Sequence, residues 1–173
     1  MELNKVAVIG LGAMGLPISI NLAKSGIQVE VWNRSDRPIK KAVEAGAVAI
    51  KDLSEITAHV VLTVLPDIKE VREVLNNGLA KALSSNGILV VMGTVSPIAI
   101  VELSKELSEK GIQVLDAPMS GGDVGAPWAG PARGGDRRAA SAQRSVPADA
   151  AIRCVGERTL HGIAGCKHRG WCR

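Results

Sequence analysis

Aromatic residues are scarce in this 173-residue chain, which has neither phenylalanine nor tyrosine and only three tryptophans. Nucleic-acid-binding surfaces combine basic residues with aromatic side chains on which bases stack. The net charge of +4 belongs to the C-terminal part, since residues 127–173 hold 9 Lys and Arg against 3 Asp and Glu, whereas residues 1–126 hold 12 against 14. With few aromatics beside this charge, we expect no nucleic-acid partner.

Long apolar runs and early cysteines are also missing. The apolar run at residues 6–9 is too short for a signal peptide, and no segment approaches the length of a membrane span. These absences predict a soluble, cytoplasmic protein without a membrane partner. The three cysteines all follow Ala126 and include no C-x-x-C pair, so we expect no metal site.

Short aliphatic segments are the main feature of the first 126 residues. Segments rich in Val, Ile and Leu are typical of strands buried on both faces of a parallel sheet. They occupy residues 5–10, 29–33, 59–65, 87–93 and 111–117. Helical patterns lie between them, with Gly26 and Gly111 as terminators. The apolar positions at helical spacing are Met14, Ile18 and Leu22, and then Ile100, Leu103 and Leu107 after the predicted cap Ser96. The alternation predicts an α/β fold, a doubly wound, mostly parallel sheet.

A glycine motif follows the first predicted strand: Gly10, Leu11, Gly12, Ala13, Met14 and Gly15 form G-x-G-x-x-G and lead into a helix. In this context the first glycine permits a tight turn, the second lets the backbone approach a pyrophosphate, and the third allows close packing of helix and strand. An ordinary glycine turn is the alternative. The flanking strands favour a Rossmann-type dinucleotide-binding domain, with phosphates at the helix N-terminus.

The end of the second predicted strand bears on which dinucleotide binds. An acidic residue there would accept hydrogen bonds from the ribose hydroxyls of NAD, but the chain has Asn33, Arg34 and Ser35. Glu30 lies in the middle of the strand and Asp36 beyond its end. Arg34, flanked by the hydrogen-bond donors Asn33 and Ser35, suits a 2′-phosphate through charge-assisted hydrogen bonds. The sequence therefore favours NADP; NAD is the alternative if Arg34 is only a solvated surface residue.

Four segments resemble the β-hydroxyacid dehydrogenases, a family that includes 3-hydroxyisobutyrate dehydrogenase, tartronate semialdehyde reductase and glyoxylate reductase. They are VIGLGAMGLPISINLAKSG (8–26), TVLPD (63–67), GTVSP (93–97) and DAPMSGG (116–122). The resemblance implies an NAD(P)-dependent oxidoreductase that transfers a hydride between the nicotinamide cofactor and a small β-hydroxyacid or its semialdehyde or aldehyde. It also implies a homo-oligomer.

The resemblance assigns roles to residues outside the glycine motif. Leu65 and Pro66 would lie against the adenine-side ribose and phosphates, and Thr94 would lie near the nicotinamide; plain turns are the alternative for each. The family often has an acid where this chain has Met92. The substrate carboxylate would bind to Ser120, Gly121 and Gly122, because two glycines without Cβ atoms can direct successive backbone N–H groups at an anion.

A catalytic lysine is the remaining part of the family pattern, within Gly-x-Gly-x-x-x-Lys-x-x-x-Asn, where it acts as a proton donor or acceptor. Lys167 is the only lysine after Lys110, and so is the candidate. Its neighbours depart from the pattern, with glycines at Gly162 and Gly165 and Trp171 where the asparagine belongs. The alternative is a surface lysine without a catalytic role.

Residues 127–173 differ in composition from the rest of the chain. Arginine outnumbers lysine there eight to one, and no helical or strand period persists. Such a composition is typical of a GC-rich gene read out of frame. We predict an NADP-binding Rossmann domain at 1–126 and an irregular basic tail at 127–173, without the family's all-helical second domain. Little or no turnover is then expected, and the alternative function is a non-catalytic dinucleotide-binding module.

Overall fold

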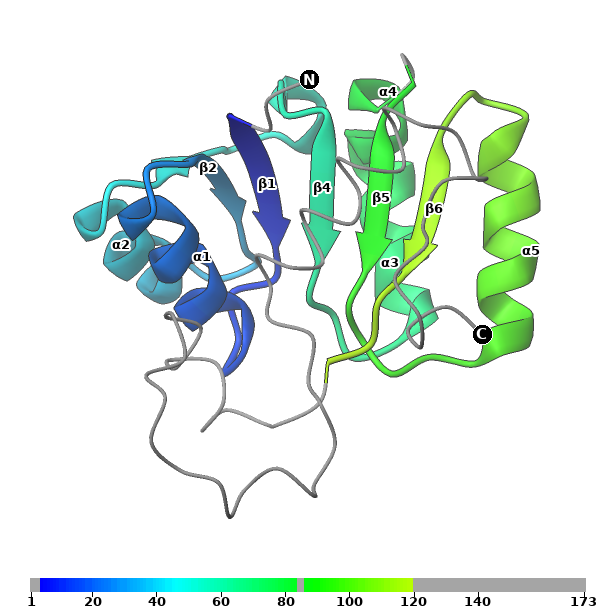
Figure 1. The fold of residues 1–173 in the computed structure, drawn as a ribbon, viewed down its shortest axis with the longest axis horizontal. Coiled ribbons are helices and arrows are strands. Elements are labelled where there is room, and N and C mark those ends of the chain that lie inside the picture. The colour runs from blue at the N-terminus through cyan, green and yellow to red at the C-terminus, as the bar shows by residue number, and fades with distance from the viewer. Residues whose placement is uncertain (1–3, 84–85, 120–173) are drawn as a thin grey trace, which may run out of the picture.

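The computed structural model describes residues 4–83 and 86–119, which form a six-stranded sheet between helices (Figure 1). All strand pairs are parallel and the order is β3-β2-β1-β4-β5-β6. The strands are β1 (Lys5–Ile9), β2 (Gln28–Trp32), β3 (Val48–Ala49), β4 (Val60–Thr63), β5 (Ile88–Val91) and β6 (Gln113–Asp116). This arrangement confirms the predicted doubly wound fold.

The carboxyl ends of five strands lie in one row across the sheet. Ile9 pairs with Trp32 on one side and with Thr63 on the other, Thr63 pairs with Val91, and Val91 pairs with Asp116. The chain order reverses between β1 and β4, and open α/β sheets bind ligands in the crevice outside the carboxyl ends at such a reversal. The loops that follow these residues therefore define where a ligand site is expected.

Both faces of the sheet are apolar because each is covered. In β1, Val6 and Val8 belong to one buried cluster and Ala7 and Ile9 to the other, and all four are fully excluded from solvent. Successive residues of a strand point to opposite faces, so a strand buried on both sides needs a continuous apolar run. This explains the aliphatic segments of the sequence.

The helices divide between the two faces (Figure 1). On one face lie α1 (Gly15–Lys24) and α2 (Asp36–Glu44), whose Ile18, Leu22 and Ala42 join the cluster around Val6 and Val8. The other face has the 3-10 turn η1 (Leu53–Glu55), α3 (Ile68–Val74), the π-type segment η2 (Leu75–Leu79), α4 (Ala80–Ala82) and α5 (Pro97–Ser108). Each face thus has its own core.

Two predicted helices are confirmed as α1 and α5. Gly26 follows α1 with φ of +87°, the left-handed conformation expected of a glycine after a helix end. Ser96 occupies the N-cap position of α5, but its side chain makes no capping hydrogen bond. The strand β3 and the helices α2, α3 and α4 were not predicted. Asp36, placed beyond the second strand, is the first residue of α2.

Some predictions fall outside the described residues. They concern Ser120, Gly121 and Gly122, the tail at 127–173 and Lys167. Within the described part of the chain, no helix has the length and apolar character that crossing a membrane requires.

Candidate functional site

The glycine loop begins where β1 ends, and the fold itself requires two of its three glycines. Gly10 has φ of +93°, and a Cβ there would lie 2.5 Å from the carbonyl oxygen of Val64. A Cβ on Gly15 would collide with the carbonyl oxygen of Gly10. A Cβ on Gly12 would have no atom within 4 Å. No described neighbour therefore requires a glycine at position 12, and the loop is open on this side to a ligand.

Asn33 connects this loop to the turn between β2 and α2. Its Oδ1 accepts a hydrogen bond of 2.9 Å from the backbone N–H of Leu11. Its Nδ2 donates to the carbonyl oxygen and to the Oγ of Ser35, each at 3.0 Å. The amide group is thus engaged by the protein, so Asn33 positions the two loops. The sequence-based assignment of Asn33 as a donor to the cofactor stays a prediction.

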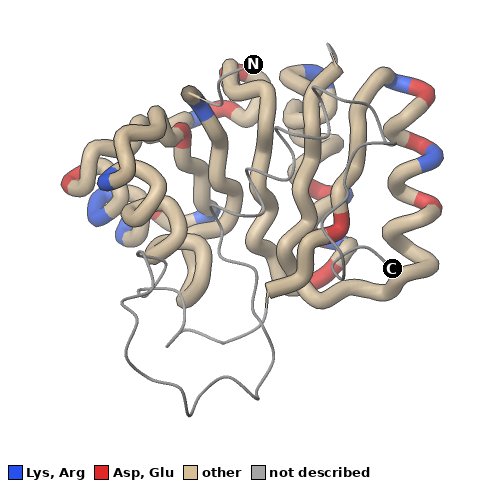
Figure 2. The backbone as a smooth tube through the Cα atoms, viewed as in Figure 1, with Lys and Arg blue, Asp and Glu red and all other residues tan. Residues whose placement is uncertain are grey.

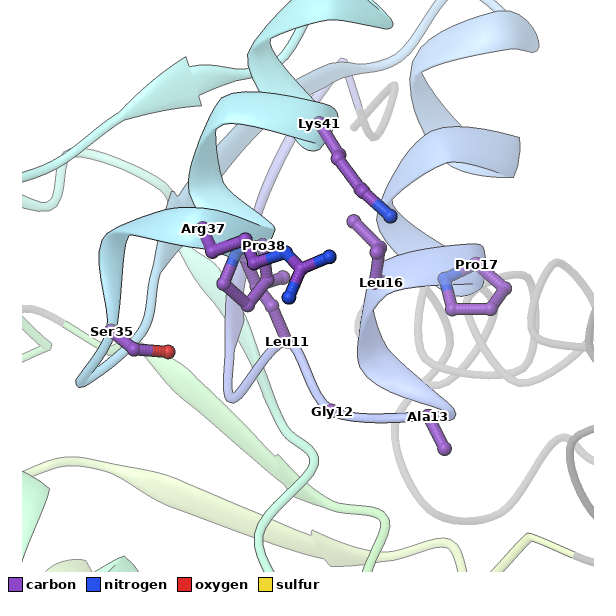
Figure 3. Close-up of a pocket in the computed structure, with 9 residues that line it drawn as sticks. All are labelled: Leu11, Gly12, Ala13, Leu16, Pro17, Ser35, Arg37, Pro38 and Lys41. Atoms are coloured by element: carbon purple, nitrogen blue, oxygen red, sulfur yellow. The ribbon is translucent and has the colours of Figure 1, made fainter.

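A cleft of about 420 Å³ lies between the glycine loop and the start of α2 (Figure 3). Figure 3 shows Arg37 and Lys41 extending from α2 toward α1, with Ser35 at the start of the same helix. The nine described residues that line the cleft are Leu11, Gly12, Ala13, Leu16, Pro17, Ser35, Arg37, Pro38 and Lys41, and none of them is acidic. The cleft therefore suits an anionic group.

Arg37 and Lys41 were not identified from the sequence. Their spacing of four residues places them on one side of a helix, but this signal becomes visible only when residues 36–44 are recognised as helical. Basic residues concentrate on this helix (Figure 2), which has Arg37, Lys40 and Lys41. The structure thus adds the basic residues of α2 to the charge that the sequence predicts at Arg34.

Arg34 does not line the cleft. Its Nη2 lies 3.2 Å from the Oε2 of Glu73, which comes from α3. Both side chains are exposed, to 76% and 55% respectively. The side chain predicted to bind a 2′-phosphate therefore lies at the edge of the site, in an ion pair between the β2–α2 turn and α3.

The loops after β4 and β5 lie on the other side of the glycine loop. The backbone N–H of Val64 donates to the carbonyl oxygen of Ile9 at 2.8 Å. A Cβ on Gly93 would collide with the carbonyl oxygen of Leu65, so these two loops are in close contact. Pro66 and Thr94 are exposed beside them. The structure thus gathers Leu65, Pro66 and Thr94 at the carboxyl edge with the glycine motif.

The acidic residues near the site are relevant both as titrating groups and as metal ligands. Burial raises the pKa of Asp116, the last residue of β6. Among the described residues, no group of three or more His, Cys, Asp or Glu side chains could hold a metal ion. Ser120, Gly121, Gly122 and Lys167 lie outside the described residues, so their assignments stay predictions.

A parallel sheet of this order, with an open glycine at a helix N-terminus and a basic cleft beside it, defines a dinucleotide-binding domain. The family model for the NAD binding domain of 6-phosphogluconate dehydrogenase matches residues 5–156. The chain belongs to this family, which confirms the predicted relationship to β-hydroxyacid dehydrogenases and a nicotinamide dinucleotide as the ligand class. The matched range extends beyond Ala126, while the boundary placed there stays a prediction.

Similar proteins include both dehydrogenases and reductases. The chain is 36% identical over 127 residues to 2-hydroxy-3-oxopropionate reductase of Escherichia coli, covering 70% of this chain and 43% of that protein. It is 31% identical over 128 residues to the NAD-dependent L-serine dehydrogenase of Pseudomonas aeruginosa, covering 72% and 43%. The chain thus spans less than half the length of these relatives.

Solved structures show the same relationship. The structure of Mycobacterium tuberculosis 3-hydroxyisobutyrate dehydrogenase with L-serine matches with a TM-score of 0.69 and 29% identity, covering 73% of this chain and 44% of that one. A second protein, in complex with NADP+ and 2-OPP, matches with a TM-score of 0.67 and 29% identity, covering 72% and 45%. The similarity confirms the fold of the described residues.

Proposed function

We propose that this chain is the cofactor-binding part of an oxidoreductase that transfers a hydride between NADP and a small β-hydroxyacid or its semialdehyde or aldehyde. The observation that carries the choice of NADP is the cleft beside Gly12, which has Arg37 and Lys41 and no acidic residue among its described lining. An NAD-specific site would place a carboxylate near the ribose hydroxyls.

The residues of the site have distinct tasks in this proposal. The open backbone at Gly12 and the N-terminus of α1 bind the pyrophosphate, because unpaired N–H groups and the helix dipole favour negative charge. Ser35, Arg37 and Lys41 bind the 2′-phosphate, with Arg34 reaching it from the edge of the cleft. Leu65, Pro66 and Thr94 orient the rest of the cofactor. The bound nicotinamide supplies the hydride-transfer chemistry.

The substrate side of the proposal rests on the family relationship. The relatives named above include a 2-hydroxy-3-oxopropionate reductase and a 3-hydroxyisobutyrate dehydrogenase. We propose a substrate of that class, with its carboxylate at Ser120, Gly121 and Gly122 and proton transfer by Lys167. A homo-oligomer and a cytoplasmic location belong to the same proposal.

Cofactor titration tests the choice of NADP. Isothermal titration calorimetry should give a lower Kd for NADPH than for NADH by about tenfold or more, because a hydrogen bond to a charged group contributes about 1.5–3 kcal/mol. Arg37→Ala and Arg34→Ala should each weaken NADPH binding and leave NADH binding nearly unchanged. Lys40→Ala is the matched control, since Lys40 lies on α2 but does not line the cleft.

Three results of these titrations would contradict the proposal. Equal or tighter binding of NADH by the unmodified chain would contradict the choice of NADP, as would an unchanged preference in both arginine variants. If neither cofactor bound to the folded chain, the dinucleotide site itself would be wrong.

A further inference from the structure

The ion pair between Arg34 and Glu73 joins the β2–α2 turn, which contributes to the proposed 2′-phosphate site, to the helix α3. Arg34 follows β2 and directly precedes Ser35, which lines the cleft. Glu73 comes from α3, which follows β4. The two residues are 39 positions apart in the sequence, so only the fold brings them together. A carboxylate therefore stands within hydrogen-bond distance of a cation that the proposed function assigns to the cofactor.

The geometry of this pair shows that it can be displaced. Arg34 contacts Glu73 through a single nitrogen at 3.2 Å, whereas Arg72 contacts Glu106 through two nitrogens at 2.6 and 2.9 Å. Single contacts between exposed side chains are weak, because water competes for both partners. A phosphate forms stronger, charge-assisted hydrogen bonds with a guanidinium group.

The two cofactors would meet Glu73 differently. The 2′-phosphate of NADPH must either displace Glu73 from Arg34 or share Arg34 with this carboxylate, which has the same sign of charge. In both cases the affinity for NADPH is lower than it would be without Glu73. The ribose of NADH has a neutral hydroxyl at that position, so it meets no such repulsion. Glu73 thus acts against NADPH alone, although it does not line the cleft.

We infer that Glu73 is a specificity-determining residue, which competes with the 2′-phosphate for Arg34 and limits the preference for NADPH. The inference rests on the proposed function, since it requires Arg34 to bind the cofactor. It predicts that the selectivity of this site is set partly from α3, through the contact of Glu73 with Arg34 in the β2–α2 turn.

Neutralising Glu73 tests this inference. In Glu73→Gln, calorimetry should show NADPH binding tighter by about two- to fivefold, the strength of an exposed ion pair, with NADH binding unchanged. Glu106→Gln is the matched control, because it removes the same charge from a different ion pair, the one between α3 and α5, and should alter neither affinity. In an Arg34→Ala background the gain from Glu73→Gln should shrink.

Each contrary result identifies which idea fails. If Arg34→Ala weakens NADPH binding but Glu73→Gln leaves it unchanged or weakens it, the inference about Glu73 is overturned while the proposed function stands. If Arg34→Ala leaves the ratio of the NADPH and NADH affinities unchanged, Arg34 has no part in selection and the inference falls with that assignment. Equal gains in Glu73→Gln and Glu106→Gln would show a general charge effect and would also overturn it.

Discussion

At the scale of single residues, Gly12 and Gly15 belong to one motif but meet opposite surroundings. The backbone of Gly10 leaves no room for a Cβ on Gly15, whereas the position of a Cβ on Gly12 is open. The first constraint comes from the packing of α1 against the end of β1. No described part of the protein constrains Gly12, and the proposed function assigns that constraint to the bound cofactor.

Alanine at these two positions should separate folding from binding. Gly15→Ala forces the glycine loop away from α1, and overpacking of this kind costs about 1–3 kcal/mol or more in the free energy of unfolding. Gly12→Ala should change that free energy by less than about 0.5 kcal/mol but should weaken cofactor binding, because the added methyl group lies where the pyrophosphate approaches. Urea denaturation and calorimetric titration measure the two effects. A stable Gly12→Ala variant with unaltered affinity for both cofactors would contradict the assignment.

At the scale of elements, α5 shows how one helix divides between core and surface. Ile100, Leu103 and Leu107 face the sheet and are buried, and Leu103 is only 1% exposed. Ile98 on the same helix is 72% exposed. The spacing of three and four residues among the buried positions is that of one helical face. The helix is held by this face, since its N-cap serine makes no capping hydrogen bond.

Truncation along α5 should follow this division. Leu103→Ala should lower the free energy of unfolding by about 2–5 kcal/mol, the range for a buried leucine that leaves a cavity. Ile98→Ala should alter it by less than about 0.5 kcal/mol. Urea denaturation monitored by circular dichroism compares the two variants on one helix. Similar losses for both would show that the outer face of α5 is covered in solution.

At the scale of the whole molecule, Glu30 joins three separate segments. Its carboxylate, in the middle of β2, accepts hydrogen bonds from Lys5 Nζ at 3.0 Å, from the backbone N–H groups of Thr57 and Ala58 at 3.0 Å each, and from Thr57 Oγ1 at 2.6 Å. Burial alone would raise the pKa of Glu30, but the hydrogen bonds from Thr57, Lys5 and Ala58 outweigh it and lower the pKa. The carboxylate therefore stabilises the fold in its charged form.

This lowered pKa gives the stability a pH dependence of known sign. A carboxyl group with a lower pKa in the folded state stabilises the fold at pH values above its unfolded pKa of about 4.3, and this contribution is lost as the pH falls through the folded pKa. Glu30→Gln should therefore lower the free energy of unfolding by about 1–3 kcal/mol at pH 7, and the difference from the unmodified chain should shrink below about pH 4.

Denaturation curves at several pH values check this expectation. Glu55→Gln is the control, since Glu55 is an exposed carboxylate of η1 near the same segment. A difference between Glu30→Gln and the unmodified chain that stayed constant from pH 7 to the acid limit of folding would contradict the role of the charged carboxylate.

Two of the elements that the sequence did not predict, β3 and α2, have weak apolar patterns. The strand β3 has only two residues, both exposed, so it presents no aliphatic run. The helix α2 has the sequence DRPIKKAVE, and only Ala42 is fully buried. Because most residues of α2 are polar, its helical pattern was not recognised in the sequence, and neither was the basic pair Arg37 and Lys41. Hydrophobic periodicity reveals helices and strands that pack an apolar face against the core, and it misses elements with few apolar contacts.

The sequence by itself determined the class of fold and the location of the glycine loop. Those features are local: an aliphatic run specifies a buried strand, and Gly15 must leave room for the backbone of Gly10, which precedes it closely in the chain. Only the tertiary structure decided that Asn33 supports the loop, that Arg37 and Lys41 line the cleft, and that Arg34 pairs with Glu73. Each of these depends on the direction of a side chain and on a partner from another element, and the linear order of residues encodes neither directly.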